Sequence, residues 1–205
     1  MRRYLLTFVA LVAPAALATG VAAQQRDVFN VEIVYQEVGC KPQRPTGNRS
    51  SPYDSVAFTV NGQRAVICYG RPSARGRTMI GGTAVPYGKL WRTGANEPTV
   101  LHIPFRATIA GVPVAPGSYS IYTVPSEGEW EVVVNRSTSQ WGHESRYTDE
   151  VKAQEVGRGK VKSSKLSDHI ETFTIKPVNA QRGADLVLEW EHSRVVVPIR
   201  TASAR

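Results

Sequence analysis

The sequence predicts an all-β chain that folds as an antiparallel β-sandwich or jelly-roll-like domain. Apolar and polar residues alternate with a period of two in about nine or ten short stretches, which is typical of half-buried strands. Turn-forming Gly, Pro and Asn residues separate these stretches, and no long segment has helical periodicity. Short strands joined by tight turns favour antiparallel pairing, because parallel strands need long crossover connections.

Residues 1–23 are expected to be a secretory signal peptide that precedes the domain. Arg2 and Arg3 form a positive start, an apolar stretch covers residues 5–17, and small residues stand at the cleavage position. A retained membrane anchor is the alternative, but the stretch is short for a spanning helix and contains Pro14. We therefore expect an exported protein, periplasmic or extracellular, with no membrane span in the mature chain.

Residues 24–54 are predicted to hold a strand at 31–35 and then a loop rich in Pro, Gly and Ser. The hairpin that follows has the strongest local signal of the chain. An apolar alternation at 56–60 runs into Asn61-Gly62, and a second apolar stretch follows at 64–69. Asn and Gly both tolerate the positive φ of a type I′ turn, so this pattern predicts two antiparallel strands joined by two residues.

The later strands are expected to complete one domain over residues 55–200, with a tail at 201–205, because no linker divides the chain and its length suits a single core. Residues 137–147 are irregular, and 150–156 fit either a short helix or an exposed linker. The predicted strands are 99–105, 107–109, 112–114, 118–124, 129–134, 158–165, 170–176, 185–191 and 194–199.

The net positive charge of the chain does not by itself indicate a nucleic-acid partner. The formal net charge is +8, from 25 Lys+Arg against 17 Asp+Glu, and two of the arginines belong to the predicted signal peptide. The rest of the chain has no Lys/Arg-rich run and no recognition-helix pattern. We expect no nucleic-acid partner, and neither composition nor motifs define an oligomeric state.

The two cysteines, Cys40 and Cys68, are expected to form a disulfide, because export places them in an oxidising compartment. Two buried free thiols are the alternative. A catalytic cysteine has the least support, since neither residue has a histidine near it in the sequence.

The segment 71–98 breaks the strand pattern and concentrates charge. It holds five basic residues against Glu97 alone, and five glycines. A connection of this length without predicted strands is unusual in a compact domain and is often functional. Tyr87 and Trp91 add flat aromatic surfaces with a polar tip.

This segment also carries a family resemblance. Tyr-Gly-Arg-Pro-Ser, Val-Pro-Tyr-Gly-Lys and above all the string from Trp91 to Glu97, Trp-Arg-Thr-Gly-Ala-Asn-Glu, resemble the bacterial family called domain of unknown function 2911. Pro-Gly-Ser-Tyr and Gln140-Trp141-Gly142 are similar to its later motifs. The resemblance covers residues 50–200 approximately and implies an exported domain, and it implies no activity.

The residue types in and near this segment predict a site for a small polar or anionic ligand, such as a cell-envelope sugar or peptide. Arginine offers a planar fork of donors for carboxylate or phosphate, and aromatic rings offer stacking faces. The predicted ligand-binding residues are Arg71, Arg75, Arg77, Tyr87, Lys89, Trp91, Arg92, Asn96, Glu97, Gln140 and Trp141.

Two alternatives remain open for the same residues. In the structural alternative the domain is a noncatalytic interaction module of the envelope, Arg92 pairs with Glu97, Trp91 fills the core and Asn96 caps a turn. In the enzymatic alternative the protein is a hydrolase of an envelope polymer, with Glu97 as the acid/base.

Other chemistries find no support in the motifs. The spacing from Gly82 to Lys89 is wrong for a phosphate-binding loop, and no Gly-x-Ser-x-Gly elbow is present. The four histidines lack a recognised metal-ligand spacing. We therefore predict no metal and no cofactor.

Overall fold

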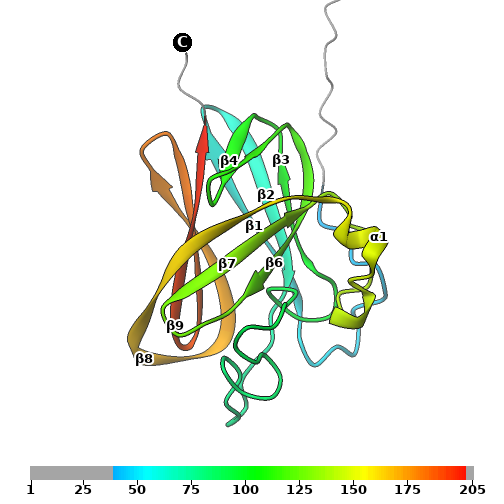
Figure 1. Cartoon of the computed structure of the whole chain (residues 1–205), viewed down its shortest axis with the longest axis vertical. Helices are drawn as coiled ribbons and strands as arrows, with labels where there is room; N and C mark the ends of the chain where they lie inside the picture. The colour runs from blue at the N-terminus through cyan, green and yellow to red at the C-terminus, as the bar shows by residue number, and fades with distance from the viewer. Residues whose placement is uncertain (1–38, 202–205) are drawn as a thin grey trace, which may run out of the picture. The chain divides into compact units, whose positions relative to one another are not determined.

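A computed structural model describes residues 39–201, which form an almost entirely β structure (Figure 1). Nine strands make one antiparallel sheet in the order β1-β2-β3-β6-β7-β8-β9-β4-β5, which confirms the predicted all-β antiparallel class. The strands are β1 (Tyr53–Val60), β2 (Gln63–Gly70), β3 (Thr99–Ile103), β4 (Ala107–Ile109), β5 (Val112–Val114), β6 (Gly117–Val124), β7 (Glu129–Asn135), β8 (Glu155–Ala180) and β9 (Gly183–Thr201).

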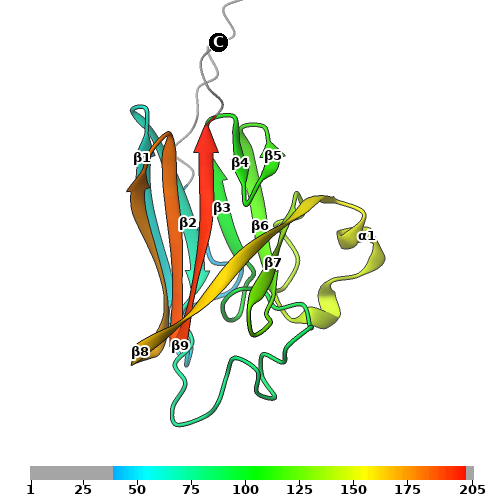
Figure 2. The ribbon, with the colours of Figure 1, turned by 60° about the vertical axis from the view of Figure 1, so that its left-hand side comes forward.

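The sandwich-like enclosure of the core comes from one sheet that folds over, and not from two separate sheets. The first part of β8 pairs with β7, whereas its later part pairs with β9 and lies against β1 and β2 (Figure 2). Tyr69 of β2 and Phe173 of β8 meet edge to face at 5.8 Å, and the Ile175 amide donates to the Tyr69 hydroxyl. The two ends of the sheet therefore cover the same core.

The predicted tight turn at Asn61-Gly62 is confirmed by its backbone angles, and a second turn of the same kind joins β4 to β5. Asn61 and Gly62 join β1 to β2 with φ of 51° and 79°. Ala110 and Gly111 join β4 to β5 with φ of 48° and 84°. Positive φ at both central residues is what a type I′ turn requires, and Asn61, Gly62 and Gly111 are of the residue types that tolerate this region.

The long strands β8 and β9 differ from the four shorter strands that the alternation predicts in this part of the chain. Register shifts let the pairing of β8 with β9 continue from Lys165 to Thr174, across residues 166–169, where the apolar pattern lapses. Bulges of this kind bend a strand without ending it, so a break in alternation does not mark a strand end here. Of the two alternatives for 150–156, the structure has a short helix: α1 covers Asp149–Lys152 and follows a 3₁₀ turn, η1 (Glu144–Arg146), and β8 already begins at Glu155.

The centre of the core is a group of four aromatic side chains. Trp91 stacks on Trp190 at 5.8 Å and meets Phe173 at 5.1 Å and Trp130 at 6.3 Å. Each of these side chains is almost completely buried. Since Trp91 belongs to the connection between β2 and β3, its burial anchors this irregular segment to the folded-over sheet.

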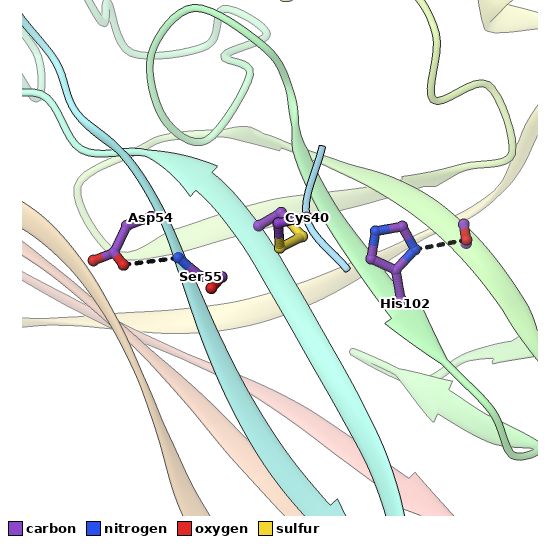
Figure 3. Close-up of a disulfide and its surroundings, with 6 residues drawn as sticks. Cys40, Asp54, Ser55 and His102 are labelled. Carbon is purple, nitrogen blue, oxygen red and sulfur yellow. Dashed lines mark hydrogen bonds between the residues drawn. A yellow bond between two sulfur atoms is a disulfide. The ribbon is translucent and has the colours of Figure 1, made fainter. Parts of the chain in front are cut away.

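Residues 39–52 lie outside any strand and are held by a covalent bond. Cys40 is bonded to Cys68 of β2, with their Cα atoms 5.5 Å apart, so the predicted disulfide is formed (Figure 3). Cys40 lies over the outer face of the sheet near His102 of β3, whose ring bonds the hydroxyl of Ser118. The bridge thus fastens the irregular segment to two paired strands.

Two predictions concern the leading part of the chain. The signal peptide at 1–23 and the strand at 31–35 lie outside the described residues. Within residues 39–201 no helix is long and apolar enough to cross a membrane.

Reduction of the disulfide is expected to lower the free energy of unfolding by about 3.5 kcal/mol, because a closed loop of this size restricts the unfolded chain. Urea unfolding of the wild-type protein with and without reductant measures the change. In Cys40→Ser the reductant should have no effect. If the oxidised and the reduced wild-type protein have the same free energy of unfolding, the bridge does not contribute to stability.

Candidate functional site

The basic residues of segment 71–98 lie in three separate places. Arg71 bonds Asp54 at 3.1 Å and the Phe173 carbonyl at 3.3 Å, so it ties β1 to β8. The backbone amide of Arg75 donates to the Glu171 carboxylate. These contacts fasten the start of the segment to β1 and β8.

The side chains of Arg75 and Arg77 are exposed, but their bonds go to main-chain carbonyls. Arg75 donates to Ser50, and Arg77 donates to Ser73 and Ala74. Both guanidinium groups therefore keep their positive charge at the surface while they brace turns.

Glu191, which sequence reasoning did not select, holds the next part of the segment. Its two carboxylate oxygens accept from the backbone amides of Met79 and Ile80, at 3.0 and 2.7 Å. Beyond this point Tyr87 is exposed, at 44%, and Lys89 is exposed beside it. Tyr87 and Lys89 thus lie on an outward loop, apart from the other predicted site residues.

The second half of the segment meets two other irregular segments. Residues 91–98, 43–53 and 137–147 converge at Arg44, Arg49, Arg92, Glu97 and Trp141, which we call the arginine–tryptophan site. Only three of its members, Arg92, Glu97 and Trp141, are among the predicted ligand-binding residues. Arg44 and Arg49 were missed because they stand in a loop of polar residues with no periodic pattern.

Glu97 is the buried centre of this site. Its side chain is 3% exposed and accepts from both terminal nitrogens of Arg49, at 2.6 and 2.8 Å, and from the Gln43 amide at 2.9 Å. Desolvation acts to raise the pKa of Glu97, but the Arg49 bonds and the Gln43 amide outweigh it and hold the pKa below its usual value. Glu97 is therefore a carboxylate whose oxygens are already occupied.

Tyr53, beside this pair, is held in its neutral form. Burial of the ring, reinforced by the negative charge of Glu97, raises the pKa of Tyr53 to about 12. A phenol with such a pKa carries its proton at neutral pH, so it contributes apolar surface and no charge.

Arg92 pairs with the carboxylate of Glu144 and not with that of Glu97, which the structural alternative expected. Its guanidinium bonds Glu144 in a two-pronged arrangement, at 3.0 and 2.8 Å, and its backbone amide bonds the same carboxylate. The expected Arg92–Glu97 pair is therefore wrong. Glu97 points toward residues 43–49, whereas Arg92 faces η1, so the fold separates two residues that are close in the sequence.

Trp141 is the aromatic surface of the site. The Arg44 guanidinium carbon lies 3.9 Å from the Trp141 ring centroid, and that of Arg49 lies at 5.9 Å. Arg44 is exposed and Trp141 is half-buried. A guanidinium over an indole face is held by cation–π attraction, which fixes its plane while its edge donors stay available.

Gln140 and Asn96 act inside this arrangement. The Gln140 side-chain amide donates to the Tyr122 hydroxyl and to the Ser137 carbonyl. Asn96 has a left-handed φ of 66° and donates to the Ser51 carbonyl. Both residues orient the backbone that carries Glu97 and Trp141.

The two motif segments are in direct contact at Gly142. A Cβ atom on Gly142 would lie 2.2 Å from the Asn96 carbonyl oxygen, so only glycine fits there. The Gln-Trp-Gly motif and the Trp-Arg-Thr-Gly-Ala-Asn-Glu motif therefore form one structural unit. Trp91, at the far end of that unit, is in the core and its indole N–H bonds Gly94.

In the described residues 39–201, no group of three or more His, Cys, Asp and Glu side chains could hold a metal ion. The ligand-binding and acid/base assignments of the sequence stay predictions. The carboxylate of Glu97 is bound to Arg49 and the Gln43 backbone amide, whereas the exposed Arg44 lies over the half-buried Trp141 ring.

Comparison with known proteins identifies one family. The family model described as "protein of unknown function (DUF2911)" matches residues 51–199, which cover all nine strands except the last two residues of β9. No curated protein and no solved structure matches the chain.

Replacement of the buried carboxylate, Glu97→Gln, is expected to lower the free energy of unfolding by about 3 kcal/mol, because it leaves Arg49 buried without its counter-charge. Chemical denaturation at neutral pH measures this loss. The matched control is Glu129→Gln, which removes an exposed pair with Lys160 and should cost less than about 0.5 kcal/mol. Equal losses in both variants would contradict the role of the buried pair.

The same pair gives the stability a pH dependence of known sign. Since the pKa of Glu97 is lower in the folded than in the unfolded state, the stabilisation is present above the ordinary carboxyl pKa and is lost as pH falls through the folded pKa. The difference between wild type and Glu97→Gln should therefore shrink below about pH 4. A difference that stays constant in acid would rule out this linkage.

The contact between the two motif segments predicts a steric effect at Gly142. Gly142→Ala should lower the free energy of unfolding by about 1–3 kcal/mol, because the added methyl group forces the Asn96 carbonyl away. Thermal unfolding measures it. Gly128→Ala is the control, since a Cβ there meets nothing within 4 Å. If both variants melt alike, the two segments do not depend on close contact.

Proposed function

The chain belongs to the family described as protein of unknown function (DUF2911), and from the geometry of its own site we propose that it binds a small polar or anionic ligand without catalysing a reaction. The ligand class is an acidic sugar or peptide of the cell envelope. The observation that carries the proposal is the exposed Arg44 guanidinium on the Trp141 ring.

The charge balance of the site supports an anion. Arg49 and Arg92 are each neutralised, by Glu97 and Glu144. Arg44 takes part in none of the ion pairs that join residues 39–201, so its charge faces solvent uncompensated. A planar guanidinium with free edge donors binds a carboxylate in two-pronged fashion, which is stronger than a neutral hydrogen bond.

The rigidity of the site supports recognition of a specific shape. The Arg49–Glu97 bonds fix the loop that carries Arg44, and the Gln43 side chain bonds the carbonyls of Thr138 and Gln140, next to Trp141. A site that is already ordered loses less conformational entropy when a ligand binds. The indole surface beside the guanidinium suits the apolar face of a sugar ring.

The geometry of the site supports the hydrolase alternative less well than it supports ligand binding. A general acid/base needs an accessible carboxyl group with a pKa near the working pH. Glu97 has a lowered pKa, and its side chain is 3% exposed. Its position suits a group that holds the site together.

The proposed setting is the periplasm or the extracellular space. The Cys40–Cys68 disulfide supports this setting, because such bonds persist mainly in oxidising compartments. Envelope sugars and peptides that carry carboxylates are ligands of such a compartment, which is why we name that class.

Tryptophan fluorescence tests the proposal directly. Trp91, Trp130 and Trp190 are buried, so a change in emission on ligand addition reports mainly on the half-buried Trp141. Titration with a short oligomer of a uronic acid should give a saturable change that weakens with added salt. Arg44→Gln should weaken binding by roughly tenfold or more, because a charge-assisted hydrogen bond is lost.

Two controls separate recognition from general charge attraction. Arg64→Gln removes an exposed cation of β2, away from the arginine–tryptophan site, and should bind as the wild type does. A neutral sugar oligomer of equal length should leave the emission unchanged. If acidic oligomers and acidic peptides both leave the wild-type emission unchanged, the interaction-module alternative is favoured instead.

A further inference from the structure

A pair of histidines on the long strands lies outside the arginine–tryptophan site. The rings of His169 in β8 and His192 in β9 have centroids 5.3 Å apart and planes inclined by 67°. Both side chains are exposed. Sequence spacing did not indicate the pair, because the two residues stand 23 positions apart on different strands.

An irregularity in strand pairing brings the two rings together. Lys165 pairs with Ser193 and Ile170 pairs with Glu191, so four residues of β8, 166–169, oppose the single residue His192 of β9. The surplus residues bulge out of the ladder and place His169 beside His192. The pair therefore depends on the bulge and not on ordinary cross-strand neighbours.

The main chain selects one proton arrangement of the His192 ring. Its Nδ1 atom lies 3.3 Å from the Leu166 carbonyl oxygen. A carbonyl oxygen only accepts, so Nδ1 carries the hydrogen of this bond and the neutral ring keeps its lone pair on Nε2. Metal-bound histidines in proteins are oriented in this way, by a carbonyl on the second ring nitrogen.

The separation of the rings matches that of two imidazoles on one ion. With metal–nitrogen bonds of about 2.0–2.1 Å and tetrahedral angles, two bound rings have centroids about 5 Å apart. The observed separation is 5.3 Å, with planes inclined by 67°, and both rings are exposed, so a modest rotation of each side chain suffices to turn one nitrogen of each toward a shared ion. We propose that His169 and His192 bind a single divalent transition-metal ion of the zinc class, with water as the remaining ligands.

The number of protein ligands defines the kind of site. Within residues 39–201 no third His, Cys, Asp or Glu completes a cluster around the pair. Structural zinc sites use four protein ligands, so a two-histidine site holds an exchangeable ion and does not determine the fold. Neutral imidazole suits Zn²⁺, Cu²⁺ and Ni²⁺, and we take Zn²⁺ as the probe.

Zinc titration of the metal-free, disulfide-bonded protein tests the site. Calorimetry should show one Zn²⁺ per chain. Nuclear magnetic resonance of the imidazole groups should show that the rings of His169 and His192 shift together while His102 and His143 do not. His169→Gln and His192→Gln should each weaken zinc binding by roughly tenfold or more, because the second ligand of a chelate acts at high effective concentration.

The control variant is His143→Gln, which removes an exposed histidine whose ring bonds the Ser145 hydroxyl. It should bind zinc as the wild type does. All three side chains are exposed, so the three variants should keep the wild-type melting temperature without zinc. The proposal is overturned if zinc binding survives in both His169→Gln and His192→Gln, or if only one of the two rings shifts. Either result would leave the pair as an edge-to-face aromatic contact.

Discussion

The buried ion pair between Glu97 and Arg49 is the constraint on which the order of the irregular segments around Arg44 and Trp141 depends. The residues around Arg49 form no strand, and the pair joins them across 48 positions to the loop that precedes β3. A carboxylate in such a buried position is stable only when its oxygens are satisfied, and Arg49 and the Gln43 amide satisfy them. The pair thereby positions Arg44 against Trp141.

The folded-over sheet supplies the rigid support behind that pair. Trp91 is packed between the ends of the sheet, on Trp190 and Phe173, so the segment that leads to Glu97 starts from a fixed point. From there the chain passes Arg92, whose bonds to Glu144 hold the segment that carries Trp141. Core packing and two ion pairs thus order a surface that has almost no regular secondary structure.

Much of the fold could be predicted because its signals are local. Alternation with a period of two marks the strands, and Asn61-Gly62 marks a turn that needs positive φ. The cysteine pair was expected from its redox setting and is bonded. The bulges that unite the parts of β8 leave no comparable sequence signal, because they arise from packing against β7 on one side and β9 on the other.

In the candidate site, the sequence predicted some of the residues but not which residues pair with one another. The amino-acid order alone established the strand class, the tight turns and the motif residues of segment 91–97. Only the tertiary structure decided that Glu97 pairs with Arg49, that Arg92 pairs with Glu144, and that Trp91 is core. The physical reason is range: backbone preferences act over a few residues, whereas the partner of a buried charge depends on which distant segments the folded-over sheet brings together.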